Sequence, residues 1–380
     1  MLIVARWPVG GIRSYLRYTY GLLSPEAFDL VLVGPQSAEF EECRKALADF
    51  QPRMYPAKSS AIPHMVRATL SALRHEKFDL VHSQGYSSAL AVALPVRLKG
   101  LRHVVSIHDM FTDALRRRMS VRLGRVALAY ALGLVDVIQP TGAAVEANFR
   151  THMSLWPATR PRIRTLRNGI DIQRFIGDDR RDLRAELQLR PDDFVIGFLG
   201  RFMAIKGFHV LVSAMEKLVL ELNPSRRPVV VAVGSGGFIR EDQAFIERRN
   251  LGDHFRFLPH TNQVAETLRG MDVVAIPSFS EASPILPMEA LSCGVPVIAS
   301  DAPGLLDVLK DSPARIFKIG DSMQLARELL ASMNGNDQDA AATFRATAMD
   351  RFDALRTARQ IETLILELTE ATPRVVSAAQ

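Results

Sequence analysis

Short apolar runs alternate along the chain with longer stretches in which apolar residues recur every three or four positions. The runs form two sets, at residues 2–5, 30–33, 80–82, 104–107 and 135–139, and at residues 194–199, 229–233, 255–258, 273–276 and 297–300. They are brief and mostly uniformly apolar, which is typical of parallel strands covered by helices on both faces. The pattern therefore predicts an α/β fold.

The length and the spacing of the runs predict two domains. A chain of 380 residues exceeds one comfortable core. A turn-rich segment, Asn168-Gly169-Ile170-Asp171, follows a strand-like run at 163–166 and separates the two sets. We expect two doubly wound Rossmann-like domains, residues 1–173 and 174–350, facing each other across a cleft. Residues 351–380 are expected to form a tail helix that crosses back to the first domain, within a helical stretch at 347–371.

One stretch, residues 278–298, carries the strongest chemical signal. It follows a predicted strand and holds two acids, Glu281 in a loop and Glu289 in a short helix. Pro287 suits the first helical position and Gly294 the C-terminal cap. Free N–H groups at such a helix start favour an anionic ligand such as phosphate, whereas acids accept hydrogen bonds from hydroxyl groups. A sugar diphosphate offers both partners.

Three glycine loops also follow predicted strands. Gly200-Arg201 and Lys206 place two fixed cations on one loop, where Arg can clamp phosphate oxygens and Lys acts as a point charge. Gly234-Ser235-Gly236-Gly237 and Gly10-Gly11 follow two other strands. A solvated loop or a plain tight turn explains each of them equally well in isolation. The second loop fits neither a Walker A motif nor G-x-G-x-x-G, which disfavours P-loop enzymes and dehydrogenases.

The histidine and cysteine residues bear on hydrolase and metal-site chemistry. His108 ends a predicted strand and could contact a substrate hydroxyl, or be structural. A Ser-His-Asp hydrolase is disfavoured because the chain has no G-x-S-x-G. Cys43 and Cys293 lack metal-ligand spacing and suit a reducing compartment. Residues 1–6 run directly into a strand, so we expect no signal peptide and a cytoplasmic protein.

The positive charge is concentrated in the first half of the chain. Residues 1–170 carry 23 Lys and Arg against 12 Asp and Glu, whereas the whole chain has a net charge of +6. Such a half indicates an anionic partner or serves solubility. Residues 115–134 predict an amphipathic helix whose apolar stripe, including Leu115, Met119, Leu123, Val126 and Tyr130, is expected to pack in the core. Its arginines, from Arg116 to Arg125, are expected to contact an anionic membrane surface. The basic segments lack interleaved aromatics, so no nucleic-acid partner is expected.

Taken together, these residues resemble the family 4 retaining glycosyltransferases, which have the GT-B fold. The resemblance runs in order along nearly the whole chain. The matching segments are Gly10-Gly11, His108, Asn168-Gly169-Ile170-Asp171, Gly200-Arg201 with Lys206-Gly207, and the Glu281/Glu289 pair with the run that follows it. The last segment is the most specific and the glycine loop is the least.

The resemblance implies a role for each charged residue. Arg201 and Lys206 would hold the donor diphosphate and offset its charge as it leaves. Glu289 would bind the ribose hydroxyls of the nucleotide, and Glu281 hydroxyls of the donor sugar. His108 would contact an outer hydroxyl of that sugar. His108, Arg201, Lys206 and Glu281 are therefore the expected catalytic residues.

Backbone groups complete the expected donor site. The resemblance implies contacts to the donor from the loops that contain Gly10, Gly11, Gly200, Gly234, Ser235, Leu258, Pro259, Ser283, Ile285 and Leu286. The family uses neither a metal nor a cofactor, because the nucleotide-sugar is a co-substrate and cations and helix ends supply the electrostatic role. Transfer would proceed with retention by front-face attack, without a protein nucleophile.

Two departures and two alternatives accompany the resemblance. Ala282-Ser283-Pro284 stands where the family often has Gly-Phe-Gly, and Pro284 removes one N–H donor. Pro259 replaces a usual glycine, which affects the expected base-recognition region. A nucleotide-sugar epimerase on the same fold would need acid/base residues, for which only Asp109 and Asp113 are available. A non-catalytic nucleotide-sugar-binding protein is disfavoured by the intact charged set. We expect transfer to a glycan or lipid-linked acceptor in bacterial cell-envelope, lipopolysaccharide or exopolysaccharide synthesis, with the protein peripheral on the cytoplasmic face of the inner membrane.

Overall fold

The computed structural model describes residues 1–111, 119–153 and 161–370. It divides into two compact units. The first unit comprises Met1–Gly169 with the segment from Ala354 onward, and the second comprises Ile170–Asp353. The chain passes from one unit to the other after Gly169 and again after Asp353, and the segment from Ala354 belongs to the first unit.

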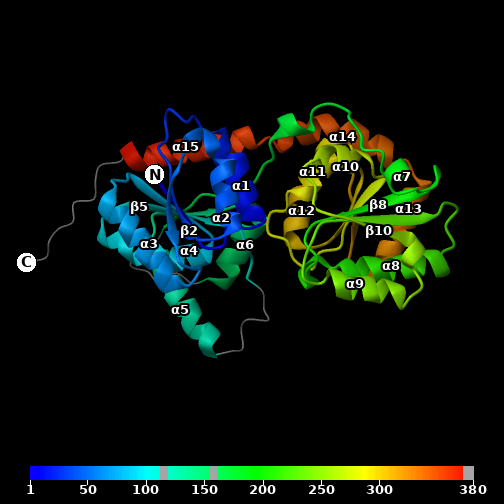
Figure 1. The fold of residues 1–380 in the computed structure, drawn as a ribbon, viewed down its shortest axis with the longest axis horizontal. Coiled ribbons are helices and arrows are strands. Elements are labelled where there is room, and N and C mark those ends of the chain that lie inside the picture. The colour runs from blue at the N-terminus through cyan, green and yellow to red at the C-terminus, as the bar shows by residue number, and fades with distance from the viewer. Residues whose placement is uncertain (112–118, 154–160, 371–380) are drawn as a thin grey trace, which may run out of the picture. The chain divides into compact units, whose positions relative to one another are not determined.

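The first unit is built on a parallel sheet with strand order β3-β2-β1-β4-β5-β6-β7 (Figure 1). The strands are β1 Leu2–Ala5, β2 Val31–Pro35, β3 Arg53–Ala57, β4 Leu80–Gln84, β5 Arg102–Ile107, β6 Val137–Pro140 and β7 Arg162–Ile163. The helices are α1 Gly11–Thr19, α2 Ala38–Ala46, α3 Ile62–His75, α4 Tyr86–Leu98, α5 Met119–Gly133, α6 Ala143–His152 and α15 Ala354–Glu370, with 3₁₀ turns η1 Tyr20–Leu22 and η2 Ala48–Phe50. The winding direction reverses between β1 and β4, which makes the unit doubly wound.

Alternate residues of the strands build two cores, one on each face of this sheet. Leu2 and Val4 of β1 belong to a core formed with α3 and α4. Ile3 and Ala5 belong to a core formed with α1, α2 and α15. Because successive strand residues point to opposite faces, a run that is apolar throughout requires helices on both sides. The prediction of a parallel, doubly covered sheet is confirmed.

The second unit has the parallel order β10-β9-β8-β11-β12-β13. Its strands are β8 Phe194–Leu199, β9 Pro228–Val233, β10 Phe255–Leu258, β11 Val273–Ile276, β12 Val297–Ser300 and β13 Arg315–Phe317. Its helices are α7 Leu183–Glu186, α8 Phe208–Leu220, α9 Ile239–Glu247, α10 Val264–Arg269, α11 Leu286–Ser292, α12 Pro303–Leu309, α13 Ser322–Asn334 and α14 Asp337–Arg351, with 3₁₀ turns η4 Ile172–Phe175, η5 Ala204–Lys206 and η6 Gly252–His254. Here the winding reverses between β8 and β11.

Two strands were not predicted, and both lie at or near sheet edges. β3 is the outermost strand of the first sheet, is only partly buried and contains Pro56. β13 is the outermost strand of the second sheet and has three residues beginning with Arg315. Edge strands bury less surface and tolerate Pro and charge, so neither shows the uniformly apolar run used for prediction.

The stretch predicted to be helical, residues 347–371, holds the end of one helix and the whole of a second, and the second lies within the expected tail helix of residues 351–380. α14 ends at Arg351 and α15 begins at Ala354. Between them, Ile170 N donates to Phe352 O at 2.8 Å, and Ile170 pairs with Asp353 in an isolated bridge. This pairing and the burial of the Phe352 side chain take the backbone out of the helix.

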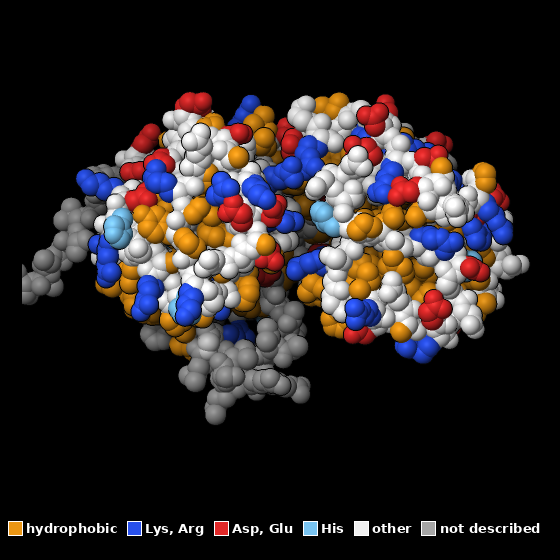
Figure 2. All heavy atoms as spheres, in the orientation of Figure 1, with side chains coloured by type: hydrophobic (Ala, Val, Ile, Leu, Met, Phe, Trp, Pro, Cys, Tyr) orange, Lys and Arg blue, Asp and Glu red, His pale blue; other side chains and the backbone are white. Residues whose placement is uncertain are grey.

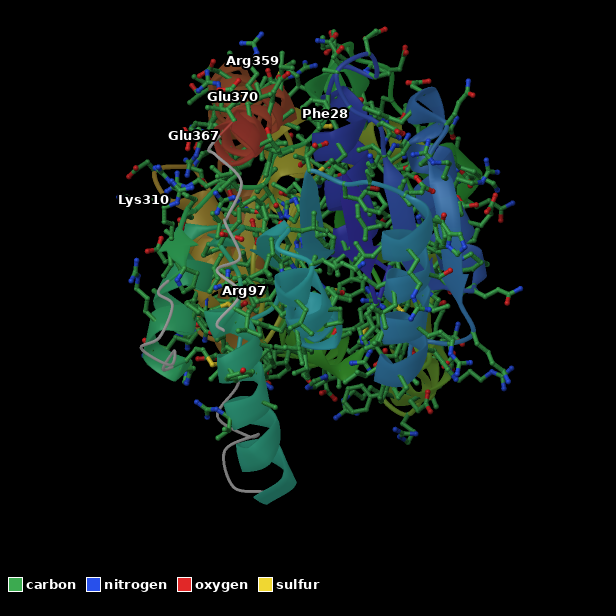
Figure 3. The ribbon with its side chains drawn as sticks, turned by 90° about the vertical axis from the view of Figure 1, so that its left-hand side faces the viewer. Phe28, Arg97, Lys310, Arg359, Glu367 and Glu370 are labelled. Carbon is green, nitrogen blue, oxygen red and sulfur yellow. The ribbon has the colours of Figure 1, made fainter. Side chains whose placement is uncertain are left out.

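α15 packs its apolar side onto the first unit. Ile361, Leu364, Ile365 and Leu368 are at most 5% exposed and join the core that contains α1. Figure 3 shows Glu367 and Glu370 at the surface of the same helix. The spacing is that of an amphipathic helix, so burial of one stripe holds the C-terminal segment on this unit.

The expectation that the apolar stripe of residues 115–134 packs in the core is wrong for its described members. Val126 is 54% exposed and Tyr130 is 52% exposed, whereas α5 buries Leu128 and Leu132. The structure does not describe Leu115 and Arg116 to Arg118, nor the side chains of Met119, Arg122 and Leu123. None of the helices in the described part of the chain has the length and apolarity needed to cross a membrane.

Replacing Ile361 with Ala should lower the free energy of unfolding by about 2–4 kcal/mol, because it leaves a cavity between α15 and the first sheet. Leu366→Ala on the same helix is the matched control, since Leu366 is 45% exposed and surface changes cost within about 0.5 kcal/mol. Urea denaturation of both variants is the measurement. Equal losses for the two variants would contradict the packing assigned to α15.

Candidate functional site

In the second unit, the glycine loops that follow β8 and β9 are in direct backbone contact. Gly200 follows β8 with φ of +148°, and its N–H donates to Val233 O at 3.0 Å. Gly234 follows β9 with φ of +146°, and a Cβ there would lie 1.9 Å from Gly200 O. Both residues need glycine, because of backbone conformation and, at Gly234, because of direct backbone contact.

Neighbouring backbone bonds join further predicted residues to these loops. Ser235 O accepts from Phe202 N at 3.0 Å, and Leu258 O accepts from Gly234 N at 3.0 Å. Pro259 follows Leu258 at the carboxyl end of β10 and is exposed. The loops after β8, β9 and β10 therefore form one continuous edge, and Arg201 lies exposed on it.

The loop after β11 joins the same edge through an ion pair. Lys206 Nζ donates to Glu281 Oε1 at 2.7 Å, and the Lys206 and Glu281 side chains are 30% and 12% exposed. Ser278 Oγ donates to the same carboxylate oxygen at 2.7 Å. Phe279 N donates to Ile205 O at 2.8 Å. The cation and the acid that were expected to bind different parts of one ligand thus contact each other.

The loop that carries Glu281 lies against a glycine in the first turn of α12. A Cβ on Gly304 would lie 2.2 Å from Glu281 O and 2.3 Å from Ala282 O. Glycine at this position lets the first turn of α12 touch the loop that carries Glu281. Pro303 precedes it and begins α12.

α11 presents its start to this edge. It spans Leu286–Ser292, with Ile285 as its N-cap and Glu289, which is 6% exposed, one turn inside. Its first N–H groups have no partner within the helix, and Ser283 precedes them at the same end. Pro287 is the second helical residue rather than the predicted first, and Gly294 lies past the C-terminal end with φ of +71°. An anion is favoured at such a helix start.

The first unit carries the remaining predicted residues at the carboxyl ends of β1 and β5. Gly10 caps α1 with φ of +52°, and a Cβ on Gly11 would meet nothing within 4 Å. The start of α1 is therefore open at Gly11. His108 follows β5, and its Nε2 lies 2.8 Å from Gln84 Oε1. Burial lowers the pKa of His108 to about 3, so the ring is neutral at physiological pH.

Sequence reasoning missed several residues that shape these edges. Ser278 bonds Glu281, and the ring of His209 stacks on Phe279 with centroids 5.5 Å apart. Gln84, the last residue of β4, holds His108. Only the position of Ser278 and Gln84 at strand ends could have signalled them, because Ser and Gln are ordinary loop residues.

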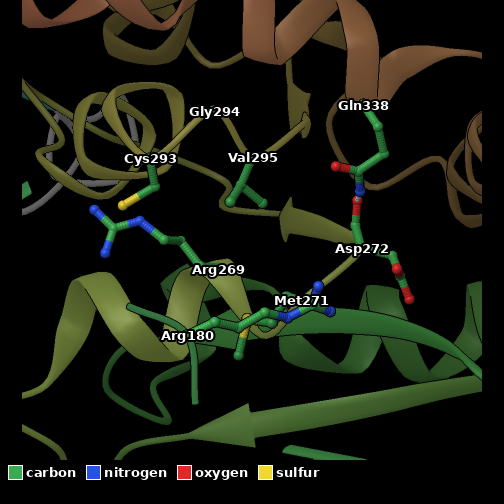
Figure 4. Close-up of a pocket in the computed structure, with 8 residues that line it drawn as sticks. All are labelled: Arg180, Arg269, Met271, Asp272, Cys293, Gly294, Val295 and Gln338. Carbon is green, nitrogen blue, oxygen red and sulfur yellow. Dashed lines mark hydrogen bonds between the residues drawn. The ribbon is translucent and has the colours of Figure 1, made fainter. Parts of the chain in front are cut away.

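A cavity of about 180 Å³ lies at the opposite edge of the second sheet (Figure 4). Its lining includes Arg269 and Asp272 just before β11 and Cys293 before β12. Arg269 donates to Phe175 O at 2.8 Å and to Asp179 O at 3.0 Å. These bonds hold the chain where it enters the second unit, so this cavity is structural and separate from the ligand edge.

No cluster of His, Cys, Asp and Glu suited to a metal ion occurs among the described residues. Both cysteines are buried as free thiols. The charged residues predicted for the site, Arg201, Lys206, Glu281 and Glu289, lie at the carboxyl edge of the second unit, where Asp301 and Lys318 also follow β12 and β13. Lys206 pairs with Glu281, whereas the Arg201 side chain is exposed and accessible to a ligand.

Two protein-family models match the chain, one in each half. The model for "Glycosyltransferase Family 4" matches residues 9–174, and the model for "Glycosyl transferases group 1" matches residues 179–349. A D-inositol 3-phosphate glycosyltransferase of Actinosynnema mirum is 32% identical over 267 residues, which is 65% of this chain. The match spans 62% of that relative's length.

Solved structures share the fold across nearly the whole chain. Anabaena HepE in complex with UDP aligns with a TM-score of 0.79 and 18% identity, covering 96% of this chain and 99% of HepE. Sucrose-phosphate synthase from Thermosynechococcus elongatus aligns with a TM-score of 0.78 and 19% identity, covering 98% and 99%. With both family models matched in order on two doubly wound units, the chain belongs to the group 1, family 4 glycosyltransferases and has the GT-B fold.

Proposed function

We propose that this protein is a retaining glycosyltransferase that moves a sugar from a nucleotide-sugar donor to a glycan or lipid-linked acceptor. The observation that carries the proposal is the loop edge of the second unit. There Lys206 Nζ lies 2.7 Å from Glu281 Oε1, at the same strand edge as the start of α11 and the contact of Gly200 with Gly234. Cations, open N–H groups and acids at one strand edge match a diphosphate linked to hydroxyl-bearing sugars.

The ion pair suggests how the ligand enters. Lys206 has three N–H donors, so it can keep Glu281 and still bind a phosphate oxygen. Alternatively, the phosphate replaces Glu281, whose oxygens then accept from sugar hydroxyls. In both arrangements the positive charge of Lys206 lies beside the leaving diphosphate. Arg201, exposed on the same loop, adds a second cation without breaking an existing bond.

The proposed reaction breaks the bond between the anomeric carbon and the diphosphate oxygen and forms a bond from that carbon to the acceptor oxygen. The acceptor proton passes to the departing phosphate oxygen on the same face, so configuration is retained. The chain's own groups stabilise negative charge as it grows on the diphosphate. No metal is required in this scheme, because Arg201, Lys206 and the helix start supply that charge.

UDP-glucose is the first donor to test, because HepE was solved with UDP-glucose as well as UDP. A UDP-, GDP-, ADP- and dTDP-sugar panel should contain one donor that raises the melting temperature and is slowly hydrolysed. Arg201→Ala should remove most of that shift, since it deletes an exposed phosphate-binding cation. No shift with any donor would contradict the proposed donor site.

Replacing Lys206 with Ala should lower turnover of that donor at least about 100-fold, as expected when one group that stabilises the leaving charge is removed. Lys217→Ala, on α8 away from the loop edge, is the matched control. Steady-state assays with and without EDTA would measure both variants. Near-normal turnover in Lys206→Ala, with the melting temperature unchanged, would exclude the leaving-group role.

The acceptor side of the proposal includes a membrane. On α4, Leu94 and Leu98 are 51% and 77% exposed and lie one turn apart. The adjacent α5 exposes Val126 and Tyr130 with the same spacing. We call these four side chains, with Arg97 and Lys99, the α4–α5 surface; Figure 3 labels Arg97.

The composition of the α4–α5 surface suits peripheral binding. Apolar side chains flanked by cations fit an interface that offers acyl chains below anionic headgroups. Elsewhere, on the face shown in Figure 2, Lys and Arg lie among Asp and Glu. We therefore propose attachment to the cytoplasmic face of the inner membrane, where lipid-linked acceptors for envelope, lipopolysaccharide or exopolysaccharide synthesis would be presented.

The double change Leu94→Glu and Leu98→Glu should reduce co-sedimentation with vesicles containing phosphatidylglycerol several-fold, because carboxylates oppose both insertion and the anionic headgroups. Leu220→Glu on α8 is the matched control, since Leu220 is 70% exposed in the other unit. Neutralising Arg116, Arg117 and Arg118 tests the arginines expected from sequence. If the unmodified protein does not sediment with these vesicles, the membrane proposal is wrong.

A further inference from the structure

The loop that follows β1 exposes a large aromatic side chain. Trp7 is 49% exposed. The other tryptophan of the chain, Trp156, lies outside the described residues. Tryptophan is highly buried on average, because its indole ring carries a large apolar area. Trp7 therefore leaves a broad apolar surface open to a ligand at the carboxyl end of a strand.

A guanidinium group lies over the same ring. Arg6 Cζ is 5.3 Å from the centroid of the Trp7 ring, within the range of a cation–π contact. Arg6 Nε donates to Ser60 O at 2.5 Å, whereas its Nη1 and Nη2 have no hydrogen-bond or ion-pair partner among the described residues. Because a guanidinium has five N–H donors, those on Nη1 and Nη2 stay available beside the ring.

The backbone holds the ring and the guanidinium in place. Arg6 N donates to Ser88 Oγ at 2.9 Å, and Ser88 is fully buried in α4. Pro8 restricts the backbone of Trp7 to extended conformations, and Trp7 O accepts from Val9 N at 2.8 Å. Groups that are already ordered lose little conformational freedom when a ligand binds. The pair is therefore preorganised.

The loop after β3 adds positive charge next to this pair. Lys58 is exposed and forms no ion pair with any residue that the structure describes. It stands two positions before Ser60, whose carbonyl holds Arg6. The loop itself is ordered by Ser59, whose Oγ lies 2.7 Å from His64 Nδ1. Two unpaired cations on adjoining loops favour an anionic group in the ligand.

The α4–α5 surface does not account for the exposure of Trp7. Ser88, which bonds Arg6, lies in the first turn of α4, whereas Leu98 is its last residue. At 1.5 Å per residue the two are about 15 Å apart along the helix. A membrane bound at the far end of α4 would leave Trp7 uncovered, so this ring needs a different partner.

An indole face beside a guanidinium fits a sugar ring that carries an anion. The C–H groups on one face of a pyranose are slightly positive and pack on the negative face of an aromatic ring. The guanidinium binds a carboxylate or a phosphate through two parallel N–H donors. Neither a neutral sugar nor a free anion uses both groups.

We propose that Trp7 and Arg6 form a binding site for an anionic pyranose on the first unit, with the sugar ring on Trp7 and its carboxylate or phosphate on Arg6. That this sugar belongs to the acceptor rests on the proposed transferase function. The binding itself involves residues of one unit and can be tested without a donor.

The first test uses the fluorescence of Trp156→Phe, in which Trp7 is the single tryptophan. Glucuronate or glucose 6-phosphate should change the emission of Trp7 with a Kd of about 10 mM or lower. Glucose and inorganic phosphate should each bind at least about tenfold more weakly, because one lacks the anion and the other the ring. No response to either anionic sugar at about 100 mM would overturn the proposal.

The second test measures sugar affinity by ligand-observed NMR in variants of the full chain. Trp7→Ala should weaken binding of the anionic sugar about tenfold, because the stacking surface is lost. Arg6→Gln should remove the preference for the anionic sugar over glucose. Leu366→Ala and Arg359→Gln are the matched controls, since both residues are exposed on α15 of the same unit. Unchanged affinity in Trp7→Ala would overturn the site.

The remaining arms distinguish other ligands for the ring. If UDP without a sugar changes the emission of Trp7 and the anionic sugars do not, the ring stacks on a base and the proposal is wrong. If only phosphatidylglycerol vesicles change it, Trp7 contacts lipid and the proposal is equally wrong. Should Trp156→Phe fail to fold, the NMR comparison of the unmodified protein with Trp7→Ala decides the question.

The binding tests also separate this inference from the proposed function. If an anionic sugar binds through Trp7 while no nucleotide-sugar is bound or hydrolysed, the transferase proposal fails and the sugar site stands. If a nucleotide-sugar is turned over while Trp7 responds to no anionic sugar, the sugar site alone is overturned.

Discussion

The contact between the backbones of Gly200 and Gly234 is the constraint on which the second unit's site depends. A Cβ on Gly234 would lie 1.9 Å from Gly200 O, so this approach is open only to glycine. It lets the loops after β8 and β9 run side by side. The loop that carries Glu281 is held equally closely by Gly304. Three loops from separate strands thus converge without side chains to separate them, and charged groups occupy the edge that results.

The ion pair of Lys206 and Glu281 follows from that convergence. Both side chains are largely withdrawn from water, and an unpaired charge there would be costly. Pairing satisfies both groups while no ligand is present. A phosphate can substitute for the acid and a hydroxyl for the cation, so the same two residues suit a ligand that carries both. The ion pair orders both side chains, and each can exchange its partner for a group of the ligand.

At the carboxyl edge of the first sheet, the buried polar groups are neutral and bond each other. His108 and Gln84 are buried at the edge of the sheet and bond each other at 2.8 Å. Burial keeps the imidazole uncharged, with its pKa near 3. Neutral groups suit recognition of a hydroxyl, whereas the cations of the second unit suit a phosphate. The carboxyl edges of the two sheets therefore differ in charge.

Local pattern alone determined the α/β class, most of the strands, the loops that carry Arg201, Lys206 and Glu281, and the short helix that carries Glu289. Uniformly apolar runs demand burial on both faces, and glycine beside charge at a strand end marks a ligand loop. Only the tertiary structure decided the edge strands β3 and β13, the break between α14 and α15, the exposure of Val126 and Tyr130, and the bond from Gln84 to His108. Each of these depends on contacts between residues far apart in sequence, such as Ile170 with Phe352, and no local periodicity records such contacts.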